Sequence, residues 1–470
     1  MGNTDEKLEF RFGAVGKFIP ILLAVAFIAI AAVSSSNVSG YVVAFLMALV
    51  LSVPFVKNEA AFGNAVMSGL TRPMFAVISM AIIFASLAGK LISSSGLVQT
   101  AAAYITGAGL TGGAFAAASF LIACVISMST GTSVGTNIIV IPILFPVGIM
   151  VGAAPEFMAG AIVSGAAFGD NLAPISDTTL ATAGTQQADM GGTVRTRCRY
   201  SVPAAVFAFV MFLIFGGGGE KAEGIGLAET AENPVSLVML LVPAVIITLC
   251  LLRKHLITAL SCGCIVGFAA GLLTGLYKPS DILGFPGGFQ VTGLFIDAVT
   301  SSMSTVAMLF GVFGMLGVLE RSGVFEAVGS ILGKLAKGTR SCEATIVGSV
   351  AILGMITGVI AVGVIAIGDL VRELGEKHGL NCYRRANLMD CAGIGFCFLA
   401  PWTVHCVLPA QLSSQFGEAF AVIPTQVAFH NYYAIGMACL LAISVLTGYA
   451  RNAGAESARQ ADAEPAGEAL

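Results

Sequence analysis

GAAFGDNLAPISDTT, residues 165–179, places two aspartates inside an otherwise apolar stretch of the chain. A carboxylate at membrane depth is costly, so an intramembrane pair such as Asp170 and Asp177 indicates a functional site. Glycine and proline also interrupt a helix, and unwound backbone at membrane depth must line a pocket or a water-filled cavity. Hard cations prefer oxygen ligands. The candidate ion ligands here are Asp170, Asn171, Ser176, Asp177 and Thr178, with a sodium ion expected at the two aspartates.

The composition is that of a polytopic membrane protein. The 470 residues are 57% hydrophobic and 10% charged, with a mean hydropathy of +0.92; soluble domains carry about 25% charged residues. Apolar runs of membrane length predict roughly ten to twelve crossings, some of which do not span fully. The first run, 18–34, lacks a cleavage site and is expected to be a retained helix. We therefore expect an all-α, multi-pass protein of the cell (plasma) membrane, embedded in the lipid bilayer.

Several functional classes lack their motifs in this chain. The 11 cysteines and 4 histidines do not show the spacing of a metal site. No G-x-x-x-x-G-K-[ST] phosphate-binding loop occurs, which argues against an ATP-driven pump. No nucleophile–base arrangement is evident, so an enzyme is not expected. These absences predict a secondary transporter with no cofactor and no nucleic-acid partner, in which sodium ions and protons are the transported or coupling ions.

The chain contains an internal repeat, in which three features of the first half recur in the second half at one constant offset. They align without gaps, and the same shift pairs the hydrophobic profiles of the two halves. Two homologous halves are the architecture of many secondary transporters. The matched pairs are Ser95-Gly96 with Ser322-Gly323, Thr130-Gly131 with Thr357-Gly358, and Leu172-Ala173-Pro174 with Leu399-Ala400-Pro401.

The distribution of basic residues predicts that the two halves are inverted relative to one another. Loops rich in lysine and arginine stay on the cytoplasmic side of a membrane. In three pairs of equivalent segments, one member carries basic residues and the other carries none. The segment 189–200 holds Arg195, Arg197 and Arg199, and its equivalent is 422–426. The segment with Lys334, Lys337 and Arg340 is equivalent to 107–113. The segment with Arg372, Lys377, Arg384 and Arg385 is equivalent to 145–158.

The same assignment predicts two inverted repeats, each with a re-entrant hairpin and a discontinuous transmembrane helix. If 107–113 and 145–158 lie on one side, the segment 114–144 must leave and return to that side. This segment is too short for two spans of about 20 residues each. The polar interruptions would meet near the midplane, where helix N-termini and free carbonyls bind ions. Candidate ligands at the hairpin tip are Ser129, Thr130, Thr132 and Ser133, with Thr136 and Asn137 as further candidates.

The second half repeats the interruption but not its acids. The positions equivalent to Asp170 and Asp177 are Cys397 and Val404, which predicts an asymmetric cation site anchored in the first half. His405 is a candidate proton relay because histidine titrates near neutral pH. The expected second-half pocket consists of Pro401, Trp402, Thr403 and His405, whereas Asp390, Asp369 and Glu320 lie near arginines and are expected at loops or interfaces.

Each candidate also has an ordinary structural interpretation. Aspartate is favoured at helix caps and turns, and small hydroxyl side chains often pack between membrane helices. His405 can be a packed histidine and Trp402 can fill the interior. Ion binding is favoured for the two aspartates because they stand beside four hydroxyl or amide side chains. Packing and ligation both stay open for the hairpin tip.

Three motifs resemble those of the NhaC-type sodium/proton antiporter family. GDNLAPISDTT, 169–179, is similar to the family's Gly-Asp-Asn-x-Ser-Pro-Leu-Ser-Asp-Thr-Thr signature. GTSVGT, 131–136, is similar to its Gly-Thr-Ser-Trp-Gly-Thr, and 400–403 to its second-half Pro-Trp-Asn. The chain departs from these motifs at three positions, with Val134 for tryptophan, Ala173 for serine and Thr403 for asparagine. The loss of the serine removes a candidate cation ligand.

The resemblance, over residues 75–410, implies paired hairpins and broken helices, sodium/proton exchange, and a homodimer formed through the outer helices. Members of the family also exchange organic acids or take up amino acids. Two functions therefore stay open. The first is an antiporter that exchanges cytoplasmic sodium for external protons by competition at the intramembrane aspartates. The alternative is a sodium-coupled symporter or exchanger of an amino acid or small carboxylic acid, and a channel is less favoured than either.

The expected organisation follows the repeat, with both termini in the cytoplasm. The segments are an N-terminal segment (1–17), N-terminal transmembrane helices (18–72), the first repeat with the ion-site hairpin and broken helix (73–216), connecting transmembrane helices (217–300), the second repeat (301–448) and a disordered tail (449–470).

Overall fold

The computed structural model describes residues 7–34, 38–110, 112–218, 233–252, 254–287 and 290–454, and these are almost entirely helical. Within those ranges, nine helices are long and apolar enough to cross a membrane, and α2 (Ile19–Val33) and α22 (Tyr432–Thr447) are shorter apolar helices. Together they match the number of crossings expected from the sequence. The prediction of an all-α, polytopic membrane protein is confirmed.

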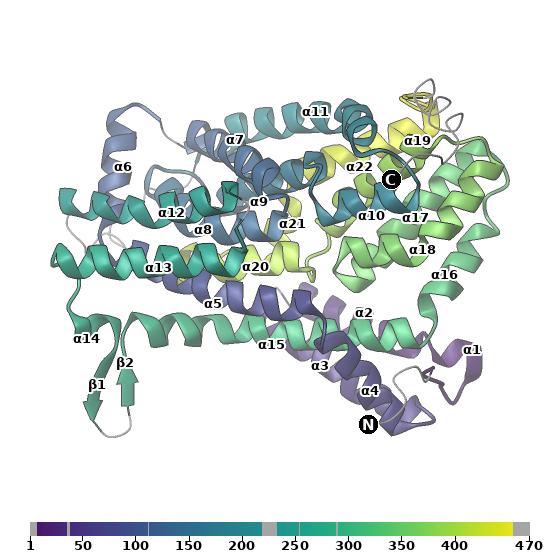
Figure 1. Cartoon of the computed structure of the whole chain (residues 1–470), viewed down its shortest axis with the longest axis horizontal. Coiled ribbons are helices and arrows are strands. Elements are labelled where there is room, and N and C mark those ends of the chain that lie inside the picture. Colours follow the sequence, from purple (N-terminus) through teal and green to yellow (C-terminus); the bar gives the residue numbers. More distant parts are fainter. Residues whose placement is uncertain are drawn as a thin grey trace, which may run out of the picture.

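One group of helices forms a layer built on the long helix α15 (Leu294–Arg321), which runs along the lower side of the molecule in Figure 1. α15 contacts α3, α4 and α5. Backbones approach closely at the α4–α15 crossing, since a Cβ on Gly317 would lie 2.1 Å from the Ala65 carbonyl oxygen. The other elements of this group are α1 (Gly13–Gly16), α2 (Ile19–Val33), α3 (Val38–Ser52), η1 (Val53–Phe55), α4 (Glu59–Leu70) and α5 (Pro73–Ser94).

The remaining elements form the two hairpin regions and the segment that connects them. The first region comprises α6 (Leu97–Gly107), α7 (Gly112–Thr130), α8 (Ser133–Met150), α9 (Pro155–Leu172), α10 (Asp177–Thr185) and α11 (Met190–Phe215). The connection comprises η2 (Pro234–Leu240), α12 (Leu241–Leu251), α13 (Leu256–Leu273), α14 (Pro279–Ile282) and an antiparallel pair of strands, β1 (Gly284–Gly287) and β2 (Gln290–Thr292). The second region comprises α16 (Val324–Gly333), α17 (Thr339–Thr357), α18 (Ile360–Lys377), α19 (Cys382–Ala392), the π-helical turn η3 (Gly393–Cys397), α20 (Val404–Ser414), η4 (Glu418–Phe420), α21 (Pro424–Phe429) and α22 (Tyr432–Thr447).

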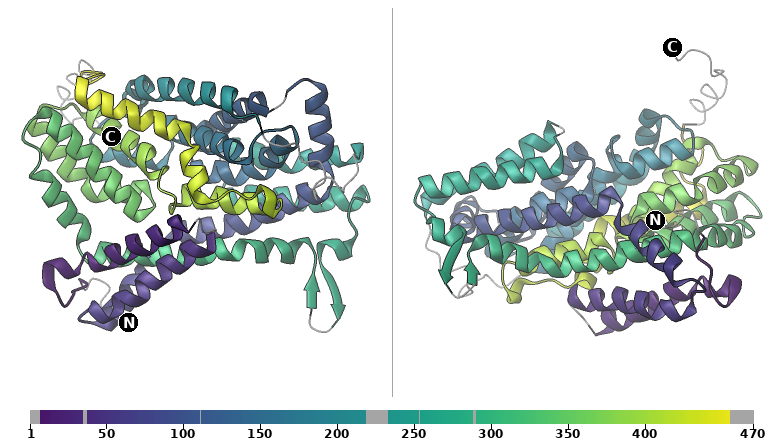
Figure 2. Two further views of the ribbon diagram at one scale, coloured as in Figure 1. Left: turned by 180° about the vertical axis from the view of Figure 1, so that it is seen from behind. Right: turned by 60° about the horizontal axis from the view of Figure 1, so that its bottom comes forward.

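Helix boundaries repeat at the constant offset found in the sequence. Helices α6 to α10 begin at Leu97, Gly112, Ser133, Pro155 and Asp177, and α16 to α20 begin at the equivalent positions Val324, Thr339, Ile360, Cys382 and Val404. Each half therefore contains a helical hairpin followed by an interrupted helix. Helices α6 and α16 lie at opposite ends of the molecule in Figures 1 and 2, as inverted halves require. The orientation of the halves in a membrane stays a prediction.

The hairpin helices are longer than the sequence predicted. α7 has 19 residues and α8 has 18, and both can cross a membrane by length and composition. The difference arises because α8 continues to Met150, inside the segment 145–158 that was expected to be a loop. A re-entrant path therefore stays a prediction that helix length does not support.

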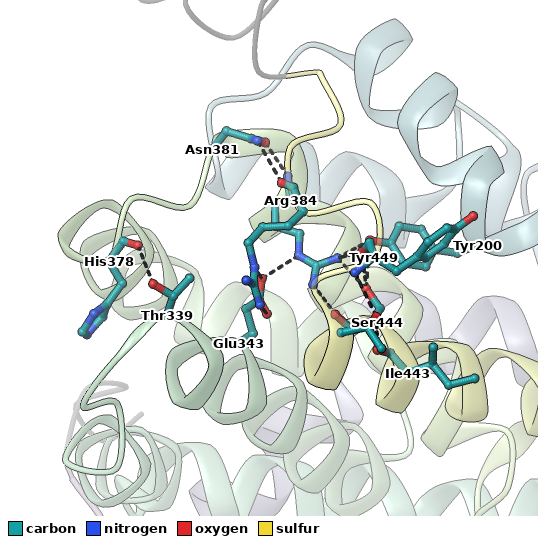
Figure 3. Close-up of polar contacts among 11 residues, drawn as sticks. Tyr200, Thr339, Glu343, His378, Asn381, Arg384, Ile443, Ser444 and Tyr449 are labelled. Carbon is teal, nitrogen blue, oxygen red and sulfur yellow. Dashed lines mark hydrogen bonds and ion pairs between the residues drawn. The ribbon is translucent and has the colours of Figure 1, made fainter.

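Three arginines that were expected in cytoplasmic loops are buried in helices. Arg384 on α19 lies between Glu343 of α17 and Ser444 of α22, at 2.9 and 2.7 Å (Figure 3). Arg385 donates to Gln186, and Arg197 on α11 pairs with a buried acid described below. These charges are tolerated inside because each has hydrogen-bonded partners. The charge bias rests instead on the basic residues that are at least partly exposed, namely Arg195, Arg199, Lys334, Lys337, Arg340, Arg372 and Lys377.

Residues 449–454, which were expected to belong to a disordered tail, are held by buried contacts. The Tyr449 carbonyl accepts a hydrogen bond from Arg384 at 3.1 Å, and Arg451 pairs with Glu343 at 2.7 Å. A buried carboxylate between two arginines therefore anchors residues 449–454. Residues 455–470 and 1–6 lie outside the described residues, so the predictions for the two ends stay untested there.

Candidate functional site

Close helix packing brings the tip of the first hairpin against the interruption between α9 and α10. A Cβ on Gly165 would lie 2.3 Å from the Phe120 carbonyl oxygen of α7, so glycine permits this approach. At the tip, Gly131 has a φ of +70°, and a Cβ there would lie 2.6 Å from Ile175 of the interruption. Glycine is required here both by the left-handed backbone and by the contact. Close packing at these glycines therefore holds the hairpin tip against the interruption.

The interruption itself spans residues 173–176, between the end of α9 and the start of α10. Pro174 cannot donate a backbone hydrogen bond, which explains why the helix stops here. The Ser176 amide donates to the Ala173 carbonyl at 3.2 Å, and α10 then begins at Asp177. The predicted broken helix is present, and Asp170 lies on the last turn before the break.

Asp170 is 6% exposed and accepts hydrogen bonds on both carboxylate oxygens. The Ser133 amide and hydroxyl donate to Oδ2 at 3.2 and 2.7 Å, and the Ser176 hydroxyl donates to Oδ1. Ser133 is the first residue of α8, so the carboxylate lies at a helix N-terminus, where the dipole favours negative charge. Hydrogen bonds to an ionised carboxylate are among the stronger ones in proteins. The hydroxyl oxygens keep lone pairs that can face a cation.

A cavity of about 70 Å³ adjoins Asp170 and reaches both halves of the chain. Among the described residues, its acidic lining consists of Asp170 and Asp177, and neither lysine nor arginine lines it. A cavity of this volume holds a few water molecules, which is enough space for a partly hydrated cation. The lining residues are Met74, Ile78, Gly131, Thr132, Ser133, Val134, Asp170, Asp177, Thr178, Gly358, Val359, Ile360, Ala361, Val404 and His405.

Four helices begin at the wall of this cavity. Ser133, Asp177, Ile360 and Val404 are the first residues of α8, α10, α18 and α20, and all four line it. Each helix N-terminus carries about half a positive charge. In the first half, Asp170 lies at the start of α8 and Asp177 at the start of α10. The convergence of hairpins and breaks predicted from the repeat is therefore present at the level of the backbone.

The structure brings together only part of the predicted first-half ligand set. Thr132, Ser133, Asp170, Asp177 and Thr178 line the cavity, and Ser176 donates to Asp170. The remaining three have other partners: Ser129 donates to the Val125 carbonyl of its own helix, Thr130 contacts Thr136, and Asn171 belongs to a buried network. The last turn of α7 thus satisfies its hydroxyls locally, so Ser129 and Thr130 are not among the lining residues.

Asp177 differs from Asp170 in its surroundings. It is exposed at the wall of the cavity, whereas Asp170 is buried. As the first residue of α10, Asp177 also has the position that favours acids at helix starts. The geometry therefore supports both a capping role and a cation contact for this residue.

Of the predicted second-half pocket, His405 alone is among the described lining residues. The Trp402 indole donates to the Met355 carbonyl of α17 at 2.6 Å, and the Thr403 hydroxyl donates to the Cys397 and Ala400 carbonyls. Pro401 lies in the turn before α20. Trp402 and Thr403 therefore hold the second interruption in shape instead of lining the pocket.

A buried network beside the interruption escaped the sequence interpretation. Arg197 and Asp390 are both fully buried and form an ion pair at 2.8 Å. The Asn171 amide donates to Asp390 at 2.6 Å, and Arg197 donates to the Asn171 carbonyl at 2.7 Å. This network joins α9, α11 and α19, and hence both halves of the chain. Arg197 also donates to the Asn387 side chain at 3.1 Å. A sequence signal existed, since Asn387 and Asp390 lie at i and i+3 and share a helix face.

Comparison with known proteins shows which proteins the chain is similar to. Residues 10–217, which include the hairpin and the interruption with Asp170 and Asp177, match the Na+/H+ antiporter family. The malate-2H+/Na+-lactate antiporter of Bacillus subtilis is 28% identical over 314 residues, 62% of this chain and 65% of that protein.

Two relatives are NhaC antiporters. Na+/H+ antiporter NhaC of Alkalihalophilus pseudofirmus is 25% identical over 310 residues, 62% of this chain and 66% of that protein. NhaC of Bacillus subtilis is 25% identical over 436 residues, 86% of this chain and 91% of that protein. The chain matches just under two thirds of the length of the first two relatives, at 65% and 66%. The family match and the NhaC relatives support an NhaC-type Na+/H+ antiporter family for this chain.

Proposed function

We propose that this protein is a secondary active transporter that exchanges cytoplasmic sodium for external protons at Asp170. The observation that carries the proposal is a buried carboxylate at the wall of a small cavity, held by Ser133 and Ser176 and close to a second acid, Asp177. Burying a carboxylate at membrane depth costs free energy, so a buried carboxylate of this kind indicates a function. Oxygen ligands around it suit a hard cation.

Coupling follows from competition for one carboxylate. Desolvation favours the neutral, protonated form of a buried carboxyl group, whereas a bound cation favours the ionised form. A proton and a sodium ion therefore exclude one another at Asp170. The ionised carboxylate without a bound cation is the costly state. The site therefore changes sides of the membrane only with a sodium ion or a proton bound, and this gives exchange.

Alternating access would use the two hairpin regions. The cavity lies where both hairpin tips and both helix interruptions meet, and α5 also contributes Met74 and Ile78. Movement of the hairpin regions against the layer of α3, α4 and α15 would open the cavity to one side or the other.

A second candidate function is the exchange or sodium-coupled transport of a small carboxylic acid. Two helix N-termini of the second half face the cavity and, in the described structure, have no acid in their first turns. A relative is described as a malate-2H+/Na+-lactate antiporter. Both functions share the cation site at Asp170.

The test is reconstitution of the purified protein into liposomes with a fluorescent pH indicator inside. An outward sodium gradient is expected to acidify the lumen, and an inward gradient to alkalinise it. The sodium concentration for half-maximal exchange is expected to rise by up to about tenfold for each unit fall in pH in the range where a proton occupies the site. Sodium-driven proton movement that is absent from pH 6 to pH 9, with or without carboxylic acids, contradicts the proposal.

The membrane orientation can be tested in the same liposomes. The inverted halves predict that cysteines placed at Leu110 and Lys337 react with impermeant reagents from opposite sides, and neither position is buried. With cytoplasmic termini, Lys337 is expected on the cytoplasmic side. Labelling of both positions from one side contradicts the inverted arrangement.

A further inference from the structure

We propose that a polar seam between α11 and α19 carries protons between the surface at Asp189 and the exchange site, with Asp390 as the relay residue that passes them to Asp170. The proposal rests on the proposed function, because it supplies the route by which protons reach the carboxylate that sodium also occupies. Sodium would use the cavity, so the two ions would reach one site by different routes.

The first observation is a pair of polar stripes on facing helices. Within each helix the polar residues recur every three or four positions, and residues at this spacing share one helix face. At the outer end of the seam, Asp189 is exposed, whereas the other members are buried. The stripes consist of Asp189, Thr193 and Arg197 along α11 and of Tyr383, Asn387 and Asp390 along α19.

The two stripes are hydrogen-bonded to one another along their length. The Tyr383 hydroxyl donates to Asp189 at the exposed end, where α11 begins. One turn further along α19, the Asn387 amide donates to the Thr196 hydroxyl of α11 at 2.8 Å. The buried ion pair described above lies at the inner end of the seam. The seam therefore connects the protein surface with that ion pair.

The second observation is an unpaired oxygen at the inner end of the seam. Asp390 is fully buried, and Arg197 and Asn171 both bond to its Oδ2 atom. Its Oδ1 atom has no hydrogen-bond partner among the residues that the structure describes. A buried polar atom without a partner is costly. Oδ1 can therefore accept a proton without displacing a described partner.

The third observation is a link of two hydroxyls between Asp390 and the exchange site. Thr178 interacts with the Asp390 carboxylate and also lines the cavity. The Thr178 hydroxyl lies 3.0 Å from that of Ser176, which donates to Oδ1 of Asp170. A hydroxyl both donates and accepts, and its hydrogen rotates to suit its partners. Two hydroxyls in series can therefore pass a proton between the two carboxylates.

The transfer conserves protons and charge. A protonated Asp390 gives its proton to the Thr178 oxygen. Thr178 gives its own proton to Ser176, which gives its own to Asp170. Three O–H bonds break and three form, and the negative charge moves from Asp170 to Asp390. The reverse sequence empties Asp170 before sodium binds.

The charges around Asp390 suit a transient proton. Arg197 of α11 pairs with it, and Asp170 of α9 is close enough for the two acids to repel one another. Cys391 and Tyr433 are further titratable groups that interact with Asp390. Two ionised carboxylates and one guanidinium carry one net negative charge, which is costly to bury. One proton or one sodium ion neutralises it, so the proton can lie on either acid when sodium is absent.

The test compares two modes of exchange in liposomes that contain the full-length protein. Exchange of radioactive for unlabelled sodium needs the cation site and no proton, whereas sodium–proton exchange needs both. The ratio of the proton-coupled rate to the sodium–sodium rate therefore reports proton delivery. We expect the double variant Arg197→Met with Asp390→Leu, which leaves no unpaired buried charge, to lower this ratio about tenfold or more.

A second set of variants keeps the test decisive if the double variant does not fold. Thr178→Val removes the linking hydroxyl and is expected to lower the ratio about tenfold or more, and Thr178→Ser to restore it to within about twofold. The matched control is Thr185→Val on the same helix, α10. Its hydroxyl donates to the Ala181 carbonyl of its own helix at 2.7 Å, so the ratio should not change.

The outcomes separate the relay from the exchange function. A ratio that stays unchanged in either folded variant, because both rates persist or both fall equally, overturns the relay and leaves the exchange proposal standing. Failure of Thr178→Ser to restore the ratio, or an equal fall in Thr185→Val, also overturns the relay. An unmodified protein that exchanges sodium for sodium but moves no protons contradicts both proposals.

Discussion

The two helix interruptions have the same backbone plan and different chemistry. In each half, a helix stops before a proline and a new helix begins at an equivalent position of the repeat, at Asp177 and at Val404. The first interruption carries Asp170 and Asp177, whereas the second carries Cys397 and Val404 at the equivalent positions. A break in a helix therefore does not require acids. This comparison favours function over capping for the aspartates, because capping would be needed equally in both halves.

Asp170→Asn is expected to have the largest effect on transport. The substitution removes the charge that Ser133 and Ser176 hold, and hence both the cation contact and the exchangeable proton. Sodium-driven proton movement should fall by about 100-fold or more, equivalent to roughly 3 kcal/mol of binding free energy. Rates in proteoliposomes, normalised to protein, measure it. Normal exchange by this variant would show that the difference between the two interruptions has no role in transport.

Arg197→Met tests the network that joins the halves. The change leaves Asp390 buried without its ion-pair partner, which typically costs about 3–5 kcal/mol. We expect a marked fall in the melting temperature in detergent, and recovery in the double variant with Asp390→Leu. The matched control is Arg372→Met, since the Arg372–Asp369 pair is exposed and contributes at most about 1 kcal/mol. Equal losses in Arg197→Met and Arg372→Met would contradict the structural role of the network.

Ser133→Ala sharpens the comparison at the hairpin tips, because the equivalent residue in the second half is Ile360. The variant removes the hydroxyl that donates to Asp170 at 2.7 Å. Sodium affinity is expected to fall about tenfold or more, the usual range for a hydrogen bond to a charged group. The control is Ser129→Ala, whose hydroxyl bonds to its own helix, and it should change sodium affinity less than twofold. A more than twofold loss of sodium affinity in Ser129→Ala would show that Ser129 is a cation ligand after all.

Asp177→Asn is expected to have the smallest effect of the four. The side chain is exposed to the cavity, so water screens its charge, and a charge contact of this kind is worth about 1 kcal/mol at about 4 Å. Sodium affinity should fall about fivefold while exchange persists. Sodium activation curves measure the change. Loss of exchange as complete as in Asp170→Asn would make the two acids equal partners in one site.

Much of the site was predictable because the apolar background makes polar residues conspicuous. Two acids in a membrane-length stretch, and hydroxyls at a glycine-containing turn, indicated an interrupted helix facing a hairpin tip. The specific partners were less predictable. Ser129 and Ser133 are both tip serines, yet one lies in the last turn of α7 and the other begins α8, so only Ser133 reaches Asp170.

Arginine counts misled the sequence interpretation for a physical reason. An arginine near an apolar stretch is read as a loop charge, but Arg197 and Arg384 are buried because Asp390 and Glu343 approach from other helices. The two members of each pair lie far apart in the chain, so no local pattern marks them as partners.

The sequence alone determined the class of the protein, its two-fold repeat and the asymmetry of its acids. Every segment that crosses the membrane must be apolar, so composition and periodicity reveal the crossings locally. The constant offset between matched features reveals the repeat. Only the tertiary structure decided which oxygens surround Asp170, that four helix ends share one cavity, and that Asn171 joins an ion pair instead of the pocket. These depend on how segments distant in the chain pack together, and such contacts are set by shape and by the need to satisfy buried polar groups.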